Sequence, residues 1–379
     1  MDQPIGLPAQ ERTNDGIFAV VPWRDFADSS GWDELARKAA EPNPFAERWC
    51  VEAGLRAFDR AGRAMIATLR VDGKLRGVAA VARKSRYEQY LLPHLAGWSH
   101  PNAFCGSPLV ASGHEHAFWR ALLAWADKHA GSAMFLHLQN LPQDGPLYAA
   151  LRDVCVLDRR RAAIVHRHER AMLRSDLAPT DYLDHSMTAK KRKELRRQYN
   201  RLAEEGTLAF ERHEDAHRLD KWIEDFLGLE AKGWKGAGNS ALANSPDTSA
   251  FFRSAIEGAA TAGKLERLSI TLGGRPIAML ANFICPPGAY SFKTTYDESL
   301  ARYSPGVLLQ RENLALLARD GIDWADSCAA ADHPMIDHIW RERRAIGRIS
   351  IAIGGPIRRF AFRLIAKAEL GRNPAGLKP

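Results

Sequence analysis

The spacing of apolar residues predicts several helices in the first half of the chain. Apolar side chains recur every three or four positions after Ser29 or Ser30 and again after Pro44, as on the buried face of an amphipathic helix. The segment HEHAFWRALLAWADKHA has the same spacing. A shorter helix is expected near Leu147–Leu151, after the β-type run AMFLHLQNL.

Two hairpins indicate that one structural plan occurs twice. In AMIATLRVDGKLRGVAAVARK, two β-type runs meet at Asp72-Gly73, and in LERLSITLGGRPIAMLANFIC two runs meet at Gly273-Gly274. Both dipeptides favour tight turns between antiparallel strands. The hairpins lie about 200 residues apart, which is too far for a solenoid repeat and fits a duplicated domain.

The second half mixes helices and strands as the first does. Its predicted helices are KWIEDFLGLEAKGWKG, AFFRSAIEGAATAG, SPGVLLQRENLALLARDG and DHPMIDHIWRERR, and its further strands are AYSFKTTYDE and IDWADSC. This order predicts an α/β fold of the α+β kind. Because 379 residues exceed one ordinary core, we expect a first domain at 15–158, a second at 159–356 and a basic amphipathic tail at 357–379.

Composition and cysteine usage narrow the class of protein. Apolar residues make up 46% and charged residues 26% of the chain, as in soluble globular proteins. The five cysteines are widely spaced and never form a C-x-x-C pair, which argues against a disulfide framework and against a zinc or other metal site. The N-terminal stretch lacks the pattern of a signal peptide. We therefore expect a cytoplasmic protein. A peripheral position at the inner face of the membrane is a second option.

The formal charge of +8 points to an anionic partner. The most basic segment, SMTAKKRKELRRQYNRLAEEG, holds seven Lys or Arg and three Glu. Leu195, Tyr199 and Leu202 form a narrow apolar face, so we expect a helix that packs on the second domain and turns its charges outward. A solvated helix face explains the charges equally well. Otherwise we favour the phosphates of coenzyme A or of lipid over nucleic acid, because no DNA-binding motif accompanies the segment.

The tail segment GPIRRFAFRLIAKAELGR is also basic. It predicts a helix with one apolar stripe and cations around it, the composition of an interfacial helix at an anionic membrane surface. A plain packing helix fits the same pattern. The apolar stripe consists of Ile357, Phe360, Leu364 and Ile365.

The segment RYSPGVLLQ has the features of a helix start that could hold phosphate. Ser304 is a candidate N-cap, Pro305 suits the first helical position and Gly306 permits close approach of a ligand. The amides of Gly306, Val307 and Leu308 would then be free for an anion. An ordinary capped helix is the alternative.

Two predicted strands carry the candidate catalytic residues. In FKTTYDE, strict alternation would place Phe292, Thr294 and Tyr296 on one face and Lys293 on the other with Ser291 and Thr295. Lys293 inside a strand needs a partner for its ammonium group, and Tyr296 is a further candidate.

In IDWADSC, Asp326 is expected inside the sheet, as a base or as the group that orients one. Cys328 shares its face, but a small core residue is the more common role of a buried cysteine. His333 follows at the start of the next predicted helix, where a helix N-terminus would keep its imidazole neutral and able to accept a proton.

The order of elements resembles that of a GNAT acyltransferase. LEAKGWKG, KTTYDESLARYSPGVLLQ and DSCAAADHPMIDHIWRERR are similar to the acetyltransferase domain of a bacterial group associated with cellulose biosynthesis, itself similar to the Fem peptidyltransferases. The resemblance covers roughly residues 160–350. It implies two tandem GNAT-like domains, each a mixed twisted sheet flanked by helices, the first degenerate. It also implies that the loop at 304–308 binds the pyrophosphate of acyl-CoA, although this loop keeps one glycine where the family has several.

The resemblance implies an N-acyltransferase that uses acyl-CoA as co-substrate, with no permanently bound cofactor. A neutral amine attacks the thioester while a base accepts its proton and a donor stabilises the oxyanion. The favoured acceptor is a long-chain sphingoid base, since bacterial ceramide synthases resemble this superfamily. An amino sugar of an envelope polysaccharide, a Fem-like use of aminoacyl-tRNA and a non-catalytic binding module remain alternatives.

Overall fold

The chain folds into two compact units. The computed structural model describes residues 9–13, 16–233, 238 and 241–377. The first unit comprises the described residues up to His168 and those from Ala345 onward, and the second comprises those of Glu169–Arg344. These boundaries differ from the expected 158/159 and 356/357, because the strand after Arg344 pairs within the first unit. Residue 15, the expected start of the first domain, lies outside the described residues.

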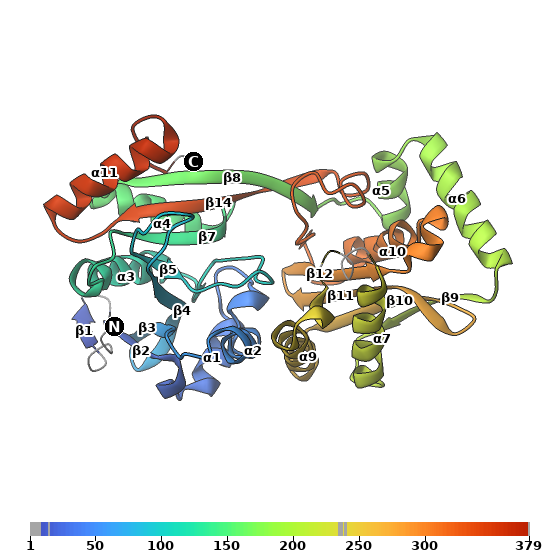
Figure 1. The fold of residues 1–379 in the computed structure, drawn as a ribbon, viewed down its shortest axis with the longest axis horizontal. Coiled ribbons are helices and arrows are strands. Elements are labelled where there is room, and N and C mark those ends of the chain that lie inside the picture. Colours follow the sequence, from blue (N-terminus) through green and yellow to red (C-terminus); the bar gives the residue numbers. More distant parts are fainter. Residues whose placement is uncertain (1–8, 14–15, 234–237, 239–240, 378–379) are drawn as a thin grey trace. The chain divides into compact units, whose positions relative to one another are not determined.

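The first unit is a mixed sheet flanked by helices (Figure 1). Its strands follow the order β1-β2-β3-β4-β5-β7-β14-β8, and β6 pairs with β4. The strands are β1 Ala9–Thr13, β2 Gly16–Pro22, β3 Met65–Val71, β4 Lys74–Lys84, β5 His94–Gly97, β6 Leu109–Val110, β7 Phe135–Pro142, β8 Ala162–Leu173 and β14 Glu342–Ala352. The helices are α1 Ser29–Ala36, α2 Arg48–Phe58, α3 Glu115–His129, α4 Pro146–Leu157 and α11 Pro356–Leu370, with 3₁₀ turns η1 Trp23–Asp25 and η2 Pro44–Ala46.

The second unit has the same kind of architecture. From the end of β8 its strands follow the order β8-β13-β12-β11-β10-β9. The strands are β9 Leu208–His213, β10 Leu265–Leu272, β11 Arg275–Cys285, β12 Gly288–Tyr296 and β13 Trp324–Asp326. The helices are α5 Pro179–Ser186, α6 Ala189–Glu204, α7 Leu219–Lys232, α9 Pro246–Thr261 and α10 Pro305–Asn313, with 3₁₀ turns η3 Leu242–Asn244, η4 Glu298–Tyr303 and η5 Leu314–Ala318.

Both predicted hairpins are confirmed. β3 pairs with β4 around Asp72-Gly73, and β10 pairs with β11 around Gly273-Gly274. All four turn residues have positive φ, which matches the twist of the flanking strands and explains the choice of Gly and Asp. The two units therefore repeat one plan, and the predicted α/β class with a mixed sheet in each half is correct.

Other predictions on secondary structure are wrong. DHPMIDHIWRERR is not a helix: residues 331–339 form successive turns, Asp332 has a φ of 56°, and β14 begins at Glu342. The strands β1, β2, β5, β6, β8, β9 and β14 were not predicted. Asp28, rather than Ser29 or Ser30, caps α1 through the Gly31 amide. The end of the predicted helix KWIEDFLGLEAKGWKG, residues 234–236, lies outside the described residues.

The basic segment forms α6 as expected. Thr188 caps the helix through the Lys191 amide, and Leu195 and Leu202 are buried in the core of the second unit. These two leucines pack inward as expected, whereas Tyr199, the third residue of the predicted apolar face, is 39% exposed. Six of the seven cations are exposed and Arg192 is half-buried.

Within the described ranges, no helix is long and apolar enough to cross a membrane.

Candidate active site in the second unit

Two neighbouring strands of the second unit separate and leave an open edge. β12 and β13 run parallel for three residue pairs, and the last pair is Tyr290 with Asp326. β13 ends there, whereas β12 continues to Tyr296 while paired with β11. Along Ser291–Tyr296, β12 therefore forms no ladder with β13. Ligands of α/β proteins commonly bind where adjacent strands diverge in this way.

A bulge at Phe292 decides which side chains lie on each face of β12. Asn282 pairs with Ser291 but Ala281 pairs with Lys293, so Phe292 is the extra residue. Ser291 and Thr294 consequently face α10, where they hydrogen-bond with Asn313 and Gln310. Phe292 faces the opposite side and packs on Phe252 of α9. The expected strict alternation, with Phe292 and Thr294 on one face, is wrong for this reason.

The α10 side of the opening brings together Tyr296, Gly306 and Met335. A Cβ atom on Gly306 would lie 2.7 Å from Met335 Sδ and 3.0 Å from Tyr296 Cδ1. A side chain at position 306 would therefore require Met335 or Tyr296 to shift. The segment after β13 returns to the start of α10 through this contact.

The start of α10 differs from a simple capped helix. Ser304 has a φ of 52° and makes no side-chain cap hydrogen bond. Its carbonyl oxygen accepts from the amides of Val307 at 2.9 Å and Leu308 at 3.0 Å. Two of the three amides expected to be free are therefore used within the helix start.

His333 lies in the turns after β13 and not at a helix N-terminus. The Met335 amide donates to His333 Nδ1 at 3.4 Å, a contact that favours the tautomer with the proton on Nε2 whenever the ring is neutral. In this tautomer the partly exposed ring offers a donor rather than a lone pair. The expected effect of a helix dipole on this histidine does not apply.

The opposite side of the opening, covered by α7 and α9, holds Asp326. The carboxylate is fully buried and accepts from Arg170 at 2.6 Å, from Arg344 at 3.3 Å and from the Cys328 amide at 2.9 Å. Burial would by itself raise the pKa of Asp326, but the two guanidinium groups outweigh it and hold the pKa below its usual value. A carboxylate in this setting accepts protons poorly and is suited to positioning its neighbours.

The other residues on this side are aromatic and cationic. Arg344 Cζ lies 4.4 Å from the ring centroid of Trp324, which packs edge-on against Tyr290. Lys293 lies on the same face, with Nζ 5.8 Å from the ring centroid of Phe292. The structure therefore divides the predicted catalytic residues: Asp326 and Lys293 lie on the α7 and α9 side, and Tyr296 lies on the α10 side.

The chain turns sharply after Asp326. Cys328 is buried and has a φ of 52°, a conformation that is costly for a residue other than glycine. The hydrogen bond from its amide to Asp326 Oδ1 holds this turn. The turn carries the chain away from β12 and so helps to create the open edge. All five cysteines are buried thiols outside any disulfide.

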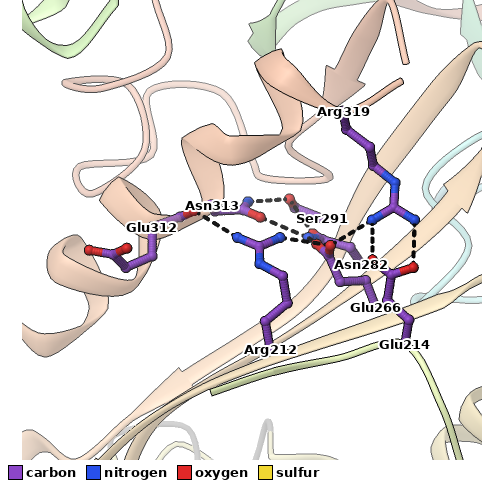
Figure 2. Close-up of polar contacts among 8 residues, drawn as sticks. All are labelled: Arg212, Glu214, Glu266, Asn282, Ser291, Glu312, Asn313 and Arg319. Atoms are coloured by element: carbon purple, nitrogen blue, oxygen red, sulfur yellow. Dashed lines mark hydrogen bonds and ion pairs between the residues drawn. The ribbon is translucent and has the colours of Figure 1, made fainter. Parts of the chain in front are cut away.

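A buried polar network fastens α10 to the sheet beside this opening. Figure 2 shows Glu266 accepting from Arg212, Arg319 and Asn282, at 2.7, 2.9 and 2.8 Å. Asn282 continues the network to Asn313 and Ser291, and Ser291 lies immediately before the bulge. Because Glu266, Asn282 and Asn313 are fully buried, their hydrogen bonds fix the position of α10 against the bulged strand.

The corresponding strands of the first unit are closed. β5 and β7 pair in parallel at Leu95–Leu136 and Ala96–His137. Beyond this point the Gly106 amide donates to Asn140 O, and Asn140 Nδ2 donates to Ala103 O. The remaining cavity of about 60 Å³ is well below the roughly 300–1,000 Å³ of ligand pockets.

The comparison with protein families decides the class of the second unit. Residues 189–333 match the family described as "Acetyltransferase (GNAT) domain". This chain carries a GNAT acetyltransferase domain. The protein is accordingly an acyltransferase, and the predicted GNAT class is confirmed. The match includes β12, β13 and the start of α10, so the open edge lies inside the GNAT domain. No curated protein is significantly similar to the chain.

Solved structures extend the likeness to nearly the whole chain. FemX has 11% identity and a TM-score of 0.56, over 90% of this chain and 99% of its own. A conserved protein of unknown function from Bacteroides thetaiotaomicron has 13% identity and a TM-score of 0.54, over 88% and 99%. The DUF2156 domain of an Agrobacterium fabrum protein described as a lysylphosphatidylglycerol synthetase has 12% identity and a TM-score of 0.50, over 93% and 98%. At these identities the likeness concerns the fold, here a GNAT-like unit occurring twice.

Proposed function

We propose that the GNAT domain transfers an acyl group from a coenzyme A thioester to a primary amine at the opening between β12 and β13. The observation that carries this proposal is the divergence of β12 and β13 after the pair Tyr290–Asp326, next to the start of α10. The pantetheine arm of coenzyme A contains amides that can hydrogen-bond with the backbone of a strand. A helix start supplies a favourable field for the phosphates.

The two sides of the opening suit the two substrates. Coenzyme A would approach from the α10 side, near Gly306, and the amine would approach from the side of Asp326 and Lys293. The amine nitrogen attacks the thioester carbon, a C–N bond forms and the C–S bond breaks. The amine proton leaves as the thiolate takes one up, so no acyl-enzyme is required. In the proposed mechanism Asp326 is a positioning residue that fixes Arg344 over Trp324.

We assign His333 the role of a hydrogen-bond donor to the leaving sulfur. The departing thiolate takes up the amine proton and leaves as the thiol, while Nε2–H of the neutral ring donates a hydrogen bond to that sulfur. The first unit is proposed to be a degenerate GNAT-like domain without a coenzyme A site, since the 103–106 segment closes its strands.

A long-chain amine is the proposed acceptor. A groove of about 610 Å³ lies between α7 and α9, on the helices that cover the Asp326 side. Small side chains such as Gly228, Ala231 and Ala250 line one part of it and leave room for a flexible alkyl chain, and the ion-paired Glu224 and Arg253 line another. A sphingoid base, which has both an alkyl chain and a polar head, fits this combination and would be acylated to a ceramide-type lipid.

The test is release of free thiol from acyl-CoA in the presence of sphingosine-type bases or glucosamine. We expect thiol release with a long-chain base and an N-acylated product by mass spectrometry. Gly306→Asp should abolish coenzyme A binding in calorimetry. Gly306→Ala introduces the same Cβ against Met335 and Tyr296 without the charge and controls for the change in packing. Gly306→Asp protein that binds coenzyme A with wild-type affinity would reject the phosphate site. Binding of coenzyme A without turnover on any amine would favour a binding module.

A further inference from the structure

Helix α11 of the first unit exposes an apolar face. Ile357, Phe360 and Leu364 are 88%, 56% and 48% exposed. Their spacing of three and four residues places them on one side of the helix. Ala361 and Ala368 complete this side, the outer face of α11, which carries no charged residue. Single exposed apolar residues are ordinary, but a continuous apolar face on a surface helix marks an interaction site.

The helix is firmly packed through its opposite side. Phe362 and Ala366 are buried in a cluster with Phe135, whose ring centroid lies 6.0 Å from that of Phe362. Ile365 packs against the same cluster, so it does not join the exposed stripe as the sequence predicted. Because the inner side of α11 already packs against this buried cluster, the exposure of the outer face of α11 does not result from poor packing of the helix.

Cations border the outer face of α11. Arg363 and Lys367 lie along one edge and Arg358 along the other, and Arg363 Cζ lies 5.3 Å from the Phe360 ring centroid. The single acid of the helix, Glu369, accepts from the Tyr87 hydroxyl at 2.7 Å and so points to the packed side. The surface thus combines an apolar centre with positively charged edges.

We propose that the outer face of α11 docks this protein on an anionic lipid bilayer. The apolar side chains would enter the boundary between headgroups and acyl chains, while the bordering cations meet lipid phosphates. A second copy of the chain is a poorer occupant, because stable protein interfaces bury about 800 Å² per partner and one helix face is narrower. Like charges would also face each other across such a dimer. The proposal is independent of the acyl-transfer reaction.

Vesicle flotation tests this docking with the full-length protein. Wild-type protein should float with vesicles containing phosphatidylglycerol and remain in solution with phosphatidylcholine alone. Phe360→Ser with Leu364→Ser should weaken binding at least tenfold, since each removes an exposed apolar side chain. Lys367→Gln should weaken it about fivefold, and high salt should act in the same direction. Leu177→Ser, which alters a 40% exposed leucine in the second unit, is the control and should bind as wild type.

Three outcomes would overturn the proposal. The first is that wild-type protein fails to bind anionic vesicles at low salt. The second is that the Phe360→Ser, Leu364→Ser protein binds vesicles as tightly as wild type. The third is that the Leu177→Ser control loses as much vesicle binding as that double variant. Light scattering adds a further check. A concentration-dependent dimer that the double variant abolishes, without vesicle binding, would assign the face to a second copy. All substituted side chains are exposed, so circular dichroism should show native folding for every variant.

Discussion

Replacing Asp326 by Asn removes one charge from the most buried ion group of the GNAT domain. The Asn side chain keeps the shape and can still accept from the Cys328 amide. The side chains of Arg170 and Arg344 are only 3% and 5% exposed, so their charges are poorly solvated once the carboxylate is gone. Removing one partner of a buried ion pair costs about 3–5 kcal/mol.

Urea unfolding of the second unit measures this cost. With a slope of about 2–3 kcal/mol per molar urea, the midpoint of Asp326→Asn should fall by about 1–2.5 M. Asp337→Asn is the matched control, since its carboxylate lies 3.9 Å from Arg343 in a more exposed pair. Such pairs contribute about 0–1 kcal/mol. A loss below about 1 kcal/mol for Asp326→Asn would refute the reasoning, because desolvation would then cancel the attraction.

The difference in unfolding free energy between wild type and Asp326→Asn should depend on pH with a definite sign. The pKa of Asp326 is lowered in the folded protein, so its stabilisation is fully present above the ordinary value of 3.8 and is lost as pH falls through the lower folded pKa. The difference in unfolding free energy between wild type and Asp326→Asn should therefore be constant from about pH 5 to 8. A difference that shrinks between pH 7 and 5 would mean that the carboxyl pKa is raised instead.

Three further predictions concern other parts of the chain. His333→Ala should lower kcat about 10²–10⁴-fold. His333→Gln, which keeps an N–H donor, should recover part of the lost rate. Equal rates for wild type, His333→Ala and His333→Gln would remove His333 from the mechanism. Burial, with His94 and Arg348 nearby, lowers the pKa of His137 to about 3. The free energy of unfolding of the first unit should therefore decrease as pH falls below 6.5. In urea titrations, His137→Leu should make this free energy depend less on pH. Asn282→Ala should destabilise the second unit by about 2–3 kcal/mol by leaving Glu266 and Ser291 under-bonded; a change below 0.5 kcal/mol would show that water replaces the amide.

The elements specified by local sequence could be predicted. The hairpin turns at Asp72-Gly73 and Gly273-Gly274 follow from residues that adopt positive φ. The α6 helix follows from its apolar spacing and from Thr188. The strands β8 and β14 could not be found in this way, because basic residues interrupt their apolar positions.

Much of the candidate site depends on contacts between distant segments. The burial of Asp326 was predictable from alternation, but its partners Arg170 and Arg344 are 156 and 18 residues away in sequence. The bulge at Phe292 arises from the register with β11 and has no local marker. The turns at 331–339 replace a predicted helix, and they bring Met335 against Gly306 at the start of α10, a contact between segments that local sequence does not reveal.

The most direct test of the account is hydrogen exchange of the full-length protein with and without acetyl-CoA. The part of β12 beyond its pairing with β13 and the start of α10 are the proposed binding elements, so peptides covering 291–296 and 304–308 should exchange more slowly with the ligand. Peptides covering 94–106 of the closed first unit should be unchanged. Protection of 94–106 alone, or no protection of the GNAT domain at saturating acetyl-CoA, would contradict the proposal that acyl transfer occurs between β12 and β13.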